Sequence, residues 1–171
     1  MTDAVGRLFA GVFGAILIFI VPLTFLFVKQ DDAKQTIIND AVVEFVDNAR
    51  ASGEITVTAY QRMMKRIISV QSCDVDVTYS SVYVYPETDS AGNVTGYRQA
   101  QRGYSNSEIV EEVYADPNKR FMELKDGGYL SVDVKNNTPT MGTKMLRLFI
   151  PGYVGRSISS TYGGYVGNNK Q

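Results

Sequence analysis

The sequence predicts an α+β fold in which one long N-terminal helix packs on a small, mainly antiparallel sheet with short additional helices. Three observations support this prediction. Residues 8–28 carry no charged side chain, a helix-period apolar stripe follows at 37–49, and strand-like alternation begins at Asp74. Apolar positions three and four apart share one face of a helix, whereas alternate positions share one face of a strand. The chain therefore begins as helix and continues largely as sheet.

The apolar run from Leu8 to Val28, LFAGVFGAILIFIVPLTFLFV, is long enough as a helix to cross the ~30 Å hydrocarbon layer of a bilayer. In lipid, every backbone amide needs a partner within the segment, so a single span is helical. The run is longer than the core of a secretory signal, and no small-x-small cleavage site precedes Lys29. We therefore expect residues 1–28 to form a short leader and a retained transmembrane helix, which Pro22 bends.

The membrane orientation follows from indirect evidence. Arg7 and the terminal amine precede the run, while Lys29 and Lys34 follow it, so the count of basic residues is nearly balanced. A leader this short has nothing to fold, and a large polar domain can be translocated largely regardless of its charge. We expect a single-pass cell membrane protein with a cytoplasmic N-terminus and a C-terminal domain that is extracytoplasmic or part of a surface filament.

The composition argues against several kinds of chemistry. The chain has one cysteine, Cys73, and no histidine, so it lacks an intrachain disulfide, a cysteine metal cage and the usual proton shuttle. Its formal net charge is -1, with both signs interspersed, which gives no field toward nucleic acid. We expect no catalytic, cofactor-binding or metal-binding residues, no cofactor, no nucleic-acid partner and no small-molecule substrate. Cys73 is expected to be a small buried hydrophobe beside a strand.

An amphipathic helix continues beyond the apolar run. Its apolar face carries Ile37, Ile38, Ala41, Val42, Phe45, Val46 and Ala49. Its polar face carries Asp31, Asp32, Asn39, Asp40, Glu44, Asp47 and Asn48. Residues 29–171 are expected to form a single extracytoplasmic α+β domain that includes this helix, because the apolar face needs a partner. Ile38, Val42, Phe45 and Val46 are the residues expected to dock the helix on the sheet.

The two helical segments are expected to join. If Lys29 and Gln30 do not interrupt the backbone, one helix runs from about residue 4 to residue 51, on the order of 70 Å at 1.5 Å per residue. Ser52-Gly53 then ends it. A second helix is expected to follow with Thr58 as its N-cap. Its buried side is predicted to be Tyr60, Met63, Met64, Ile67 and Ile68.

The rest of the chain reads as strands and short helices. A strand from Asp74 closes at Pro86, and residues 94–104 return as its hairpin partner. A helix is then expected to start with a Ser105–Glu108 capping box and to end near Asp116-Pro117. Residues 121–124 and 129–134 are expected to form a further hairpin, and residues 157–166 a last strand. Between these, a helix is expected with Thr138 as N-cap and with Met141, Met145, Leu148 and Phe149 on one side. Tyrosines concentrate in the predicted strands, where some are expected to line an interface.

Small residues lie within the apolar run. Gly11 and Ala15 have the small-xxx-small spacing that allows two membrane helices to approach closely. We expect Gly11, Gly14, Ala15 and Pro22 to be the membrane-helix packing residues, and self-association through the N-terminal helix is a further expectation. The other expected partners are membrane lipid and envelope proteins.

A membrane helix that continues as an amphipathic helix and docks on a small antiparallel sheet resembles the architecture of type IV pilin-like proteins. The stretches AVVEFVDNARASGEITVTAYQRMMKRI and KDGGYLSVDVKNNTPTMGTKMLRLF are similar to the small TadE-like pseudopilins of Gram-positive Tad-type pilus systems. The resemblance implies a minor pilin or an envelope component of the filament machine. Pilins carry a glutamate at the fifth residue after the cleavage point, whereas cleavage after Gly6 would place Gly11 there, and the first glutamate is Glu44. An uncleaved, membrane-bound assembly factor therefore fits better than a major subunit.

Three classes of function remain open at the level of sequence. The first is a non-enzymatic, membrane-anchored structural or assembly component of a bacterial pilus or envelope machine. The alternative is a membrane-anchored ligand-binding or regulatory ectodomain, which would need a concave apolar pocket with converging polar groups. The third is a membrane-bound enzyme, which would need grouped carboxylates or another site without histidine. We expect the first.

Overall fold

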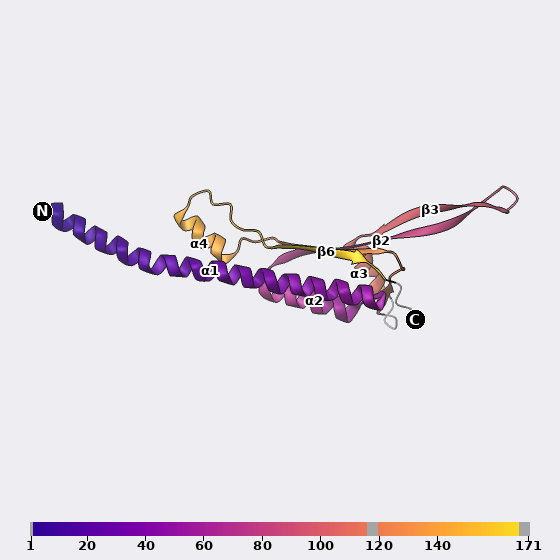
Figure 1. The fold of residues 1–171 in the computed structure, drawn as a ribbon, viewed down its shortest axis with the longest axis horizontal. Coiled ribbons are helices and arrows are strands. Elements are labelled where there is room, and N and C mark those ends of the chain that lie inside the picture. The colour runs from indigo at the N-terminus through magenta and orange to yellow at the C-terminus, as the bar shows by residue number, and fades with distance from the viewer. Residues whose placement is uncertain (1, 116–119, 168–171) are drawn as a thin grey trace.

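The computed structural model describes residues 2–115 and 120–167, and it has the α+β architecture that the sequence predicts (Figure 1). The helices are α1 (Thr2–Ser52), α2 (Val57–Val70), α3 (Asn106–Ala115) and α4 (Met141–Phe149). The strands are β1 (Glu54–Thr56), β2 (Cys73–Thr88), β3 (Val94–Tyr104), β4 (Phe121–Glu123), β5 (Tyr129–Asn136) and β6 (Ser159–Tyr165). The N-terminal part of α1 extends well beyond the other elements, which gather along its C-terminal part. We call these gathered elements, together with the C-terminal part of α1, the head.

The single N-terminal helix is confirmed. α1 continues without a break through Lys29 and Gln30, contains Pro22, and curves gently along its length (Figure 1). It ends where expected, because Gly53 adopts a left-handed conformation with φ of 72° and donates its N–H to the carbonyl of Ala49 at 2.9 Å. A glycine in this conformation satisfies a terminal helix carbonyl without the strain that a Cβ atom would bring.

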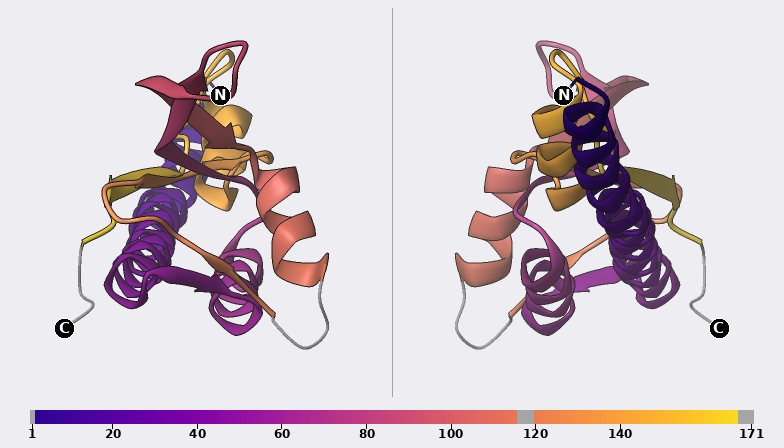
Figure 2. Two further views of the ribbon diagram at one scale, coloured as in Figure 1. Left: turned by 90° about the vertical axis from the view of Figure 1, so that its right-hand side faces the viewer. Right: turned by 90° about the vertical axis from the view of Figure 1, so that its left-hand side faces the viewer.

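The larger sheet has four antiparallel strands in the order β3-β2-β5-β6. Its central register sets Val77 opposite Val132 and Tyr79 opposite Leu130, so the apolar alternation of both strands faces one side. The predicted hairpin of the strand from Asp74 with residues 94–104 is confirmed. The predicted end of this strand at Pro86 is wrong, because β2 continues to Thr88 and Pro86 lies opposite Tyr97. Seen end-on in Figure 2, α1 and α2 lie together on one face of this sheet.

The predicted hairpin of 121–124 with 129–134 is wrong. β4 pairs instead with β1, with Met122 opposite Ile55, while β5 lies between β2 and β6. The two-stranded ladder is extended by a hydrogen bond from the Leu124 N–H to the Gly53 carbonyl at 2.8 Å. The physical reason is that β5 places Leu130 in the core and needs neighbours on both edges, and β2 and β6 supply them.

The second helix starts earlier than expected. The N-cap of α2 is Thr56 and not Thr58, because Thr56 is still extended through its pairing with Phe121 and its hydroxyl accepts the N–H of Ala59 at 3.2 Å. Met63 and Ile67 are buried on the predicted side of this helix, but Ile68 is exposed.

The later helices also differ from expectation at their ends. The N-cap of α4 is Thr140, which accepts the N–H of Thr143 at 3.1 Å. Thr138 stays outside the helix because its carbonyl and hydroxyl accept hydrogen bonds from Gln71. The capping box of α3 forms, since Glu108 accepts the Ser105 N–H at 2.8 Å. Its predicted stop at residues 116–117 lies outside the described residues, and the last strand covers 159–165 within the predicted 157–166.

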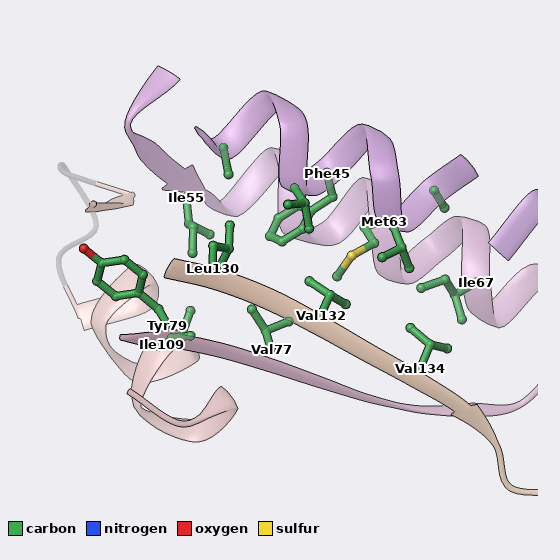
Figure 3. Packing of buried hydrophobic residues seen from close by; sticks show 14 of the residues in the cluster. Phe45, Ile55, Met63, Ile67, Val77, Tyr79, Ile109, Leu130, Val132 and Val134 are labelled. Carbon is green, nitrogen blue, oxygen red and sulfur yellow. The ribbon is translucent and has the colours of Figure 1, made fainter. Parts of the chain in front are cut away.

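The core lies between α1, α2 and the sheet (Figure 3). The helices contribute Phe45, Met63 and Ile67, and the sheet contributes Val77, Leu130, Val132 and Val134. Ile55 and Ile109 close the end of the core near Tyr79. Because burying each such side chain stabilises a fold by about 1.5–3 kcal/mol, this cluster attaches the C-terminal part of α1 firmly to the sheet.

Candidate functional site

The N-terminal part of α1 is long and apolar enough to cross a membrane. Its most apolar window has a mean hydropathy of 2.6, and none of that window is buried inside the protein. Large side chains point outward on every side of the helix, as Leu8, Ile18 and Phe19 do with 69%, 72% and 74% of their surface exposed. Exposed apolar surface of this extent in a single helix is typical of a segment that contacts lipid or other apolar helices.

The predicted membrane-packing residues lie along this exposed segment. Gly11 and Ala15 are one turn apart and exposed, Gly14 is half-exposed, and Pro22 lies further along the helix. A Cβ atom built on Gly11 or Gly14 would meet nothing within 4 Å. The head does not reach these residues, so their surface is open to another helix.

The four residues predicted to dock α1 on the sheet are buried together. Ile38, Val42 and Val46 have no exposed surface, and Phe45 is 3% exposed. The Phe45 ring meets the Tyr60 ring of α2 edge-on, with centroids 6.3 Å apart. The structure thus brings the docking residues into one contact region, separate from the membrane-packing residues.

Polar contacts also tie α1 to the edge strand β6, and sequence reasoning missed them. The Gln35 amide donates to the Ser159 carbonyl at 2.8 Å and accepts the Ser159 N–H at 3.1 Å. Fifteen residues further on, Arg50 donates to the Tyr165 carbonyl at 2.7 Å, and the Tyr162 hydroxyl donates to Asp47 at 3.1 Å. Contacts at both ends of β6 fix the helix direction relative to the sheet.

The structure corrects the prediction that Asp31 lies on the exposed polar face of α1. Its side chain is 7% exposed and lies under the first turn of α4, where a Cβ atom on Gly142 would come within 2.6 Å of Asp31 Oδ2. The carboxylate lies beside the first turn of α4, and its Oδ1 atom is buried without a hydrogen-bond partner among the described residues. The sequence feature that could have indicated this contact is Gly142, because a glycine in the first turn of a helix allows another helix to approach closely.

The free end of the β2–β3 hairpin projects beyond the rest of the head, on the side opposite the N-terminus (Figure 1). The pairing of β2 with β5 ends at Ser80, so residues 81–88 pair only with β3. Val84, Tyr85 and Tyr97 are exposed on this ribbon. The prediction that some strand tyrosines line an interface therefore has its best candidates here, since Tyr79 is buried in the core.

A second exposed apolar surface lies on α4 and the turn that follows it. We call Met141, Leu148, Phe149, Ile150 and Val154 the α4 patch, since all five are exposed. Leu148 and Val154 are 74% and 86% exposed. The sequence predicted that Met141, Leu148 and Phe149 share one side of a helix, but their place at the base of the head required the structure.

Few groups have the character of a reactive site. Cys73 is half-buried in β2 against the core, and burial together with Asp74 raises the pKa of its thiol, which stays protonated at neutral pH. The hydrogen bond to Tyr83, 3.1 Å long, is the main cause that raises the pKa of Tyr104 to about 12. In residues 2–115 and 120–167, no cluster of acidic or cysteine side chains could hold a metal ion.

No family model, curated protein or solved structure matches this chain.

Proposed function

We propose that this chain is a membrane-anchored, non-enzymatic structural or assembly protein, a pseudopilin-like component of a bacterial pilus or envelope machine. One observation carries the proposal: a single helix is both the apolar segment and the spine of the head. The N-terminus is cytoplasmic in this proposal, and the head lies outside the cell membrane.

The junction between the two parts of α1 supports a rigid anchor. Residues 29–34 are helical rather than a linker rich in Gly, Ser or Pro. Within this stretch Asp32 pairs with Arg156 at 2.6 Å, and just beyond it Gln35 binds the backbone of Ser159. An ectodomain that only captures ligands has no need of a fixed angle to the membrane, whereas a component that builds an ordered assembly does.

The exposed N-terminal part of α1 supports association within the membrane. A helix with small residues at one face and large apolar residues elsewhere packs closely against a similar helix. The resemblance to pilin-like proteins points the same way, because their architecture joins a membrane helix to an amphipathic helix on a small sheet. The partners proposed here are other copies of this chain and other proteins of the pilus or envelope machine.

The rigidity of the junction can be tested in the native host. The double variant Lys29→Gly with Gln30→Pro breaks the helix, since glycine costs about 1 kcal/mol and proline about 3 kcal/mol inside a helix. The matched control is Lys29→Ala with Gln30→Ala, which removes the same side chains and keeps the helix. We expect both proteins to stay in the membrane after alkaline carbonate extraction, and only the control to restore surface filaments or envelope assembly in a deletion strain.

Association through the membrane helix can be tested by disulfide crosslinking in a Cys73→Ser background. Cysteine at Gly11 or Ala15 lies on the small-residue face, and cysteine at Ile20 lies on the opposite face of the same helix. Oxidation should give dimers from the first two positions and not from Ile20. Release of the protein by carbonate, or full assembly by the broken-helix variant, would overturn the proposal.

A further inference from the structure

The α4 patch is held beside the end of the apolar segment. Its helix starts at the junction of α1, where a Cβ atom on Gly142 would lie 2.6 Å from Asp31 Oδ2 and 3.5 Å from the Phe27 carbonyl. From there α4 points toward the N-terminal side of the molecule and slants away from α1, so its far end is level with the last turns of the apolar run (Figure 1). The C-terminal end of α4 is therefore at the level where α1 would leave the hydrocarbon layer.

The patch is ordered by its own contacts. Arg147 donates to the carbonyls of Tyr153 and Val154 at 3.0 and 3.2 Å, which closes the turn after α4. The Ile150 N–H donates to the Leu146 carbonyl at 2.8 Å and continues the helix end. Exposed apolar side chains that are held in place so firmly are suited to a fixed partner surface.

The charge around the patch favours one kind of partner. Within residues 134–167 every charged residue is basic, namely Lys135, Lys144, Arg147 and Arg156. On the neighbouring α1, Asp32 pairs with Arg156 and Asp31 lies under the first turn of α4, so Lys144 is the basic residue of α4 that remains for a partner. Anionic phospholipid headgroups attract basic residues, and apolar side chains of an amphipathic helix enter the layer just below the headgroups. A half-buried tyrosine, Tyr153, lies in the same turn, and tyrosine is enriched at this depth.

We infer that the α4 patch inserts into the interfacial zone of the membrane on the side of the head, with Lys144 at the anionic headgroups, so that the head touches the bilayer beside its own anchor. This inference rests on the proposed function, because α1 must span the membrane for the patch to reach it. The contact sets the tilt of the head as a second attachment point, separate from α1.

Three probe positions of nearly equal exposure test the contact. Leu148, Tyr97 and Ile18 are 74%, 74% and 72% exposed, and they lie in the α4 patch, the outlying hairpin and the apolar run. Each is replaced singly by cysteine in a Cys73→Ser background of the full chain and labelled with an environment-sensitive fluorophore. The proteins are reconstituted in vesicles of phosphatidylcholine with phosphatidylglycerol, with or without lipids brominated on their acyl chains.

The expected result is strong quenching of the Ile18 and Leu148 probes by brominated lipid, and quenching of the Tyr97 probe by iodide only. If the Ile18 probe is not quenched by lipid, the proposed function itself fails. If Ile18 is quenched by lipid while Leu148 responds to iodide as Tyr97 does, the patch faces water and the inference alone is overturned. Protection of Leu148 from both quenchers would mean that protein covers the patch, which also overturns it.

Variants of the patch separate apolar contact from charge. Val154→Asp should reduce the lipid quenching of the Leu148 probe several-fold, and Lys144→Glu should reduce it only in vesicles that contain phosphatidylglycerol. The control is Val82→Asp, an exposed valine on the hairpin, which should leave the Leu148 signal unchanged. Equal quenching of the Leu148 probe in the parent and the Val154→Asp protein would contradict the inference.

Discussion

The two parts of α1 obey the same helical geometry and meet different surroundings. In residues 4–28 nearly every large apolar side chain is exposed, whereas in residues 31–50 one face is buried and the other is polar. The buried face is explained by the head, which it helps to build. Within residues 2–115 and 120–167 nothing covers the exposed segment, and its length and composition are those of a helix that could cross a membrane.

Removal of a phenyl ring from each part gives the largest contrast. Phe45→Ala should destabilise the head by about 3–5 kcal/mol, because the ring is 3% exposed and its loss leaves a cavity. Phe19→Ala should leave the unfolding of the head unchanged, because that ring is 74% exposed and far from the core. The measurement is denaturant unfolding of the full chain in detergent, followed by tyrosine fluorescence. Equal effects of the two variants would contradict the division of α1.

A substitution where α4 contacts the junction between the two parts of α1 should give the next largest loss of stability. Gly142→Ala should destabilise the docking of α4 by about 1–3 kcal/mol, because the new methyl group would lie 2.6 Å from the buried Asp31 carboxylate. Adding Asp31→Ala should recover part of this loss, since the two side chains then no longer collide. A double-mutant cycle measured by denaturant unfolding gives the coupling. Independent, additive effects would show that α4 does not seat on Asp31.

Loss of the hydrogen bonds between α1 and β6 should change the stability of the head less. Gln35→Ala removes two hydrogen bonds to the Ser159 backbone and should cost about 1 kcal/mol, because each bond contributes modestly at a partly exposed site. The control is Thr36→Ala, whose hydroxyl bonds only within α1. Hydrogen exchange of the β6 amides should rise in the first variant and not in the second. Unchanged β6 protection in Gln35→Ala would show that the Gln35 hydrogen bonds do not hold β6 against α1.

A pH response confined to the head gives the smallest effect. The Ser105 backbone N–H and hydroxyl hold the pKa of Glu108 below its usual value of 4.5. A carboxylate with a lowered folded-state pKa stabilises the fold above its unfolded pKa, and the gain is lost as the pH falls through the folded value. Glu108→Gln should therefore slightly lower the melting temperature at neutral pH and make no difference in strong acid. A difference that persists in acid would exclude this carboxylate as its source.

The elements that the sequence predicted are those whose signal is local. The apolar stripe from Ile38 to Ala49 predicted the amphipathic part of α1 and its docking residues. The 94–104 strand and the Ser105–Glu108 capping box could be predicted because they depend only on residues nearby in the sequence. β4 was misread because a three-residue strand takes its partner from the tertiary arrangement, in this case β1. Asp31 was misread because its burial depends on Gly142, which lies far along the chain.

The candidate interaction surfaces were also predictable only where their signal is local in the sequence. The small residues of the apolar run and the stripe around Phe45 could be listed from spacing alone. The position of the α4 patch could not, since an apolar side on a short helix gives no hint of the direction in which that helix runs. The register that leaves residues 81–88 paired only with β3 was likewise invisible, because it depends on where β5 ends.

The unbroken spine has a mechanical consequence. Fifty-one helical residues make a rod on the order of 75 Å long at 1.5 Å per residue, and the hairpin extends beyond its far end. A sideways pull at the hairpin tip acts on a lever arm, so it reaches an embedded end as torque and not as stretch of a slack tether. With the N-terminal part of α1 anchored as proposed, force applied to the hairpin would thereby be converted into a change of the angle of α1.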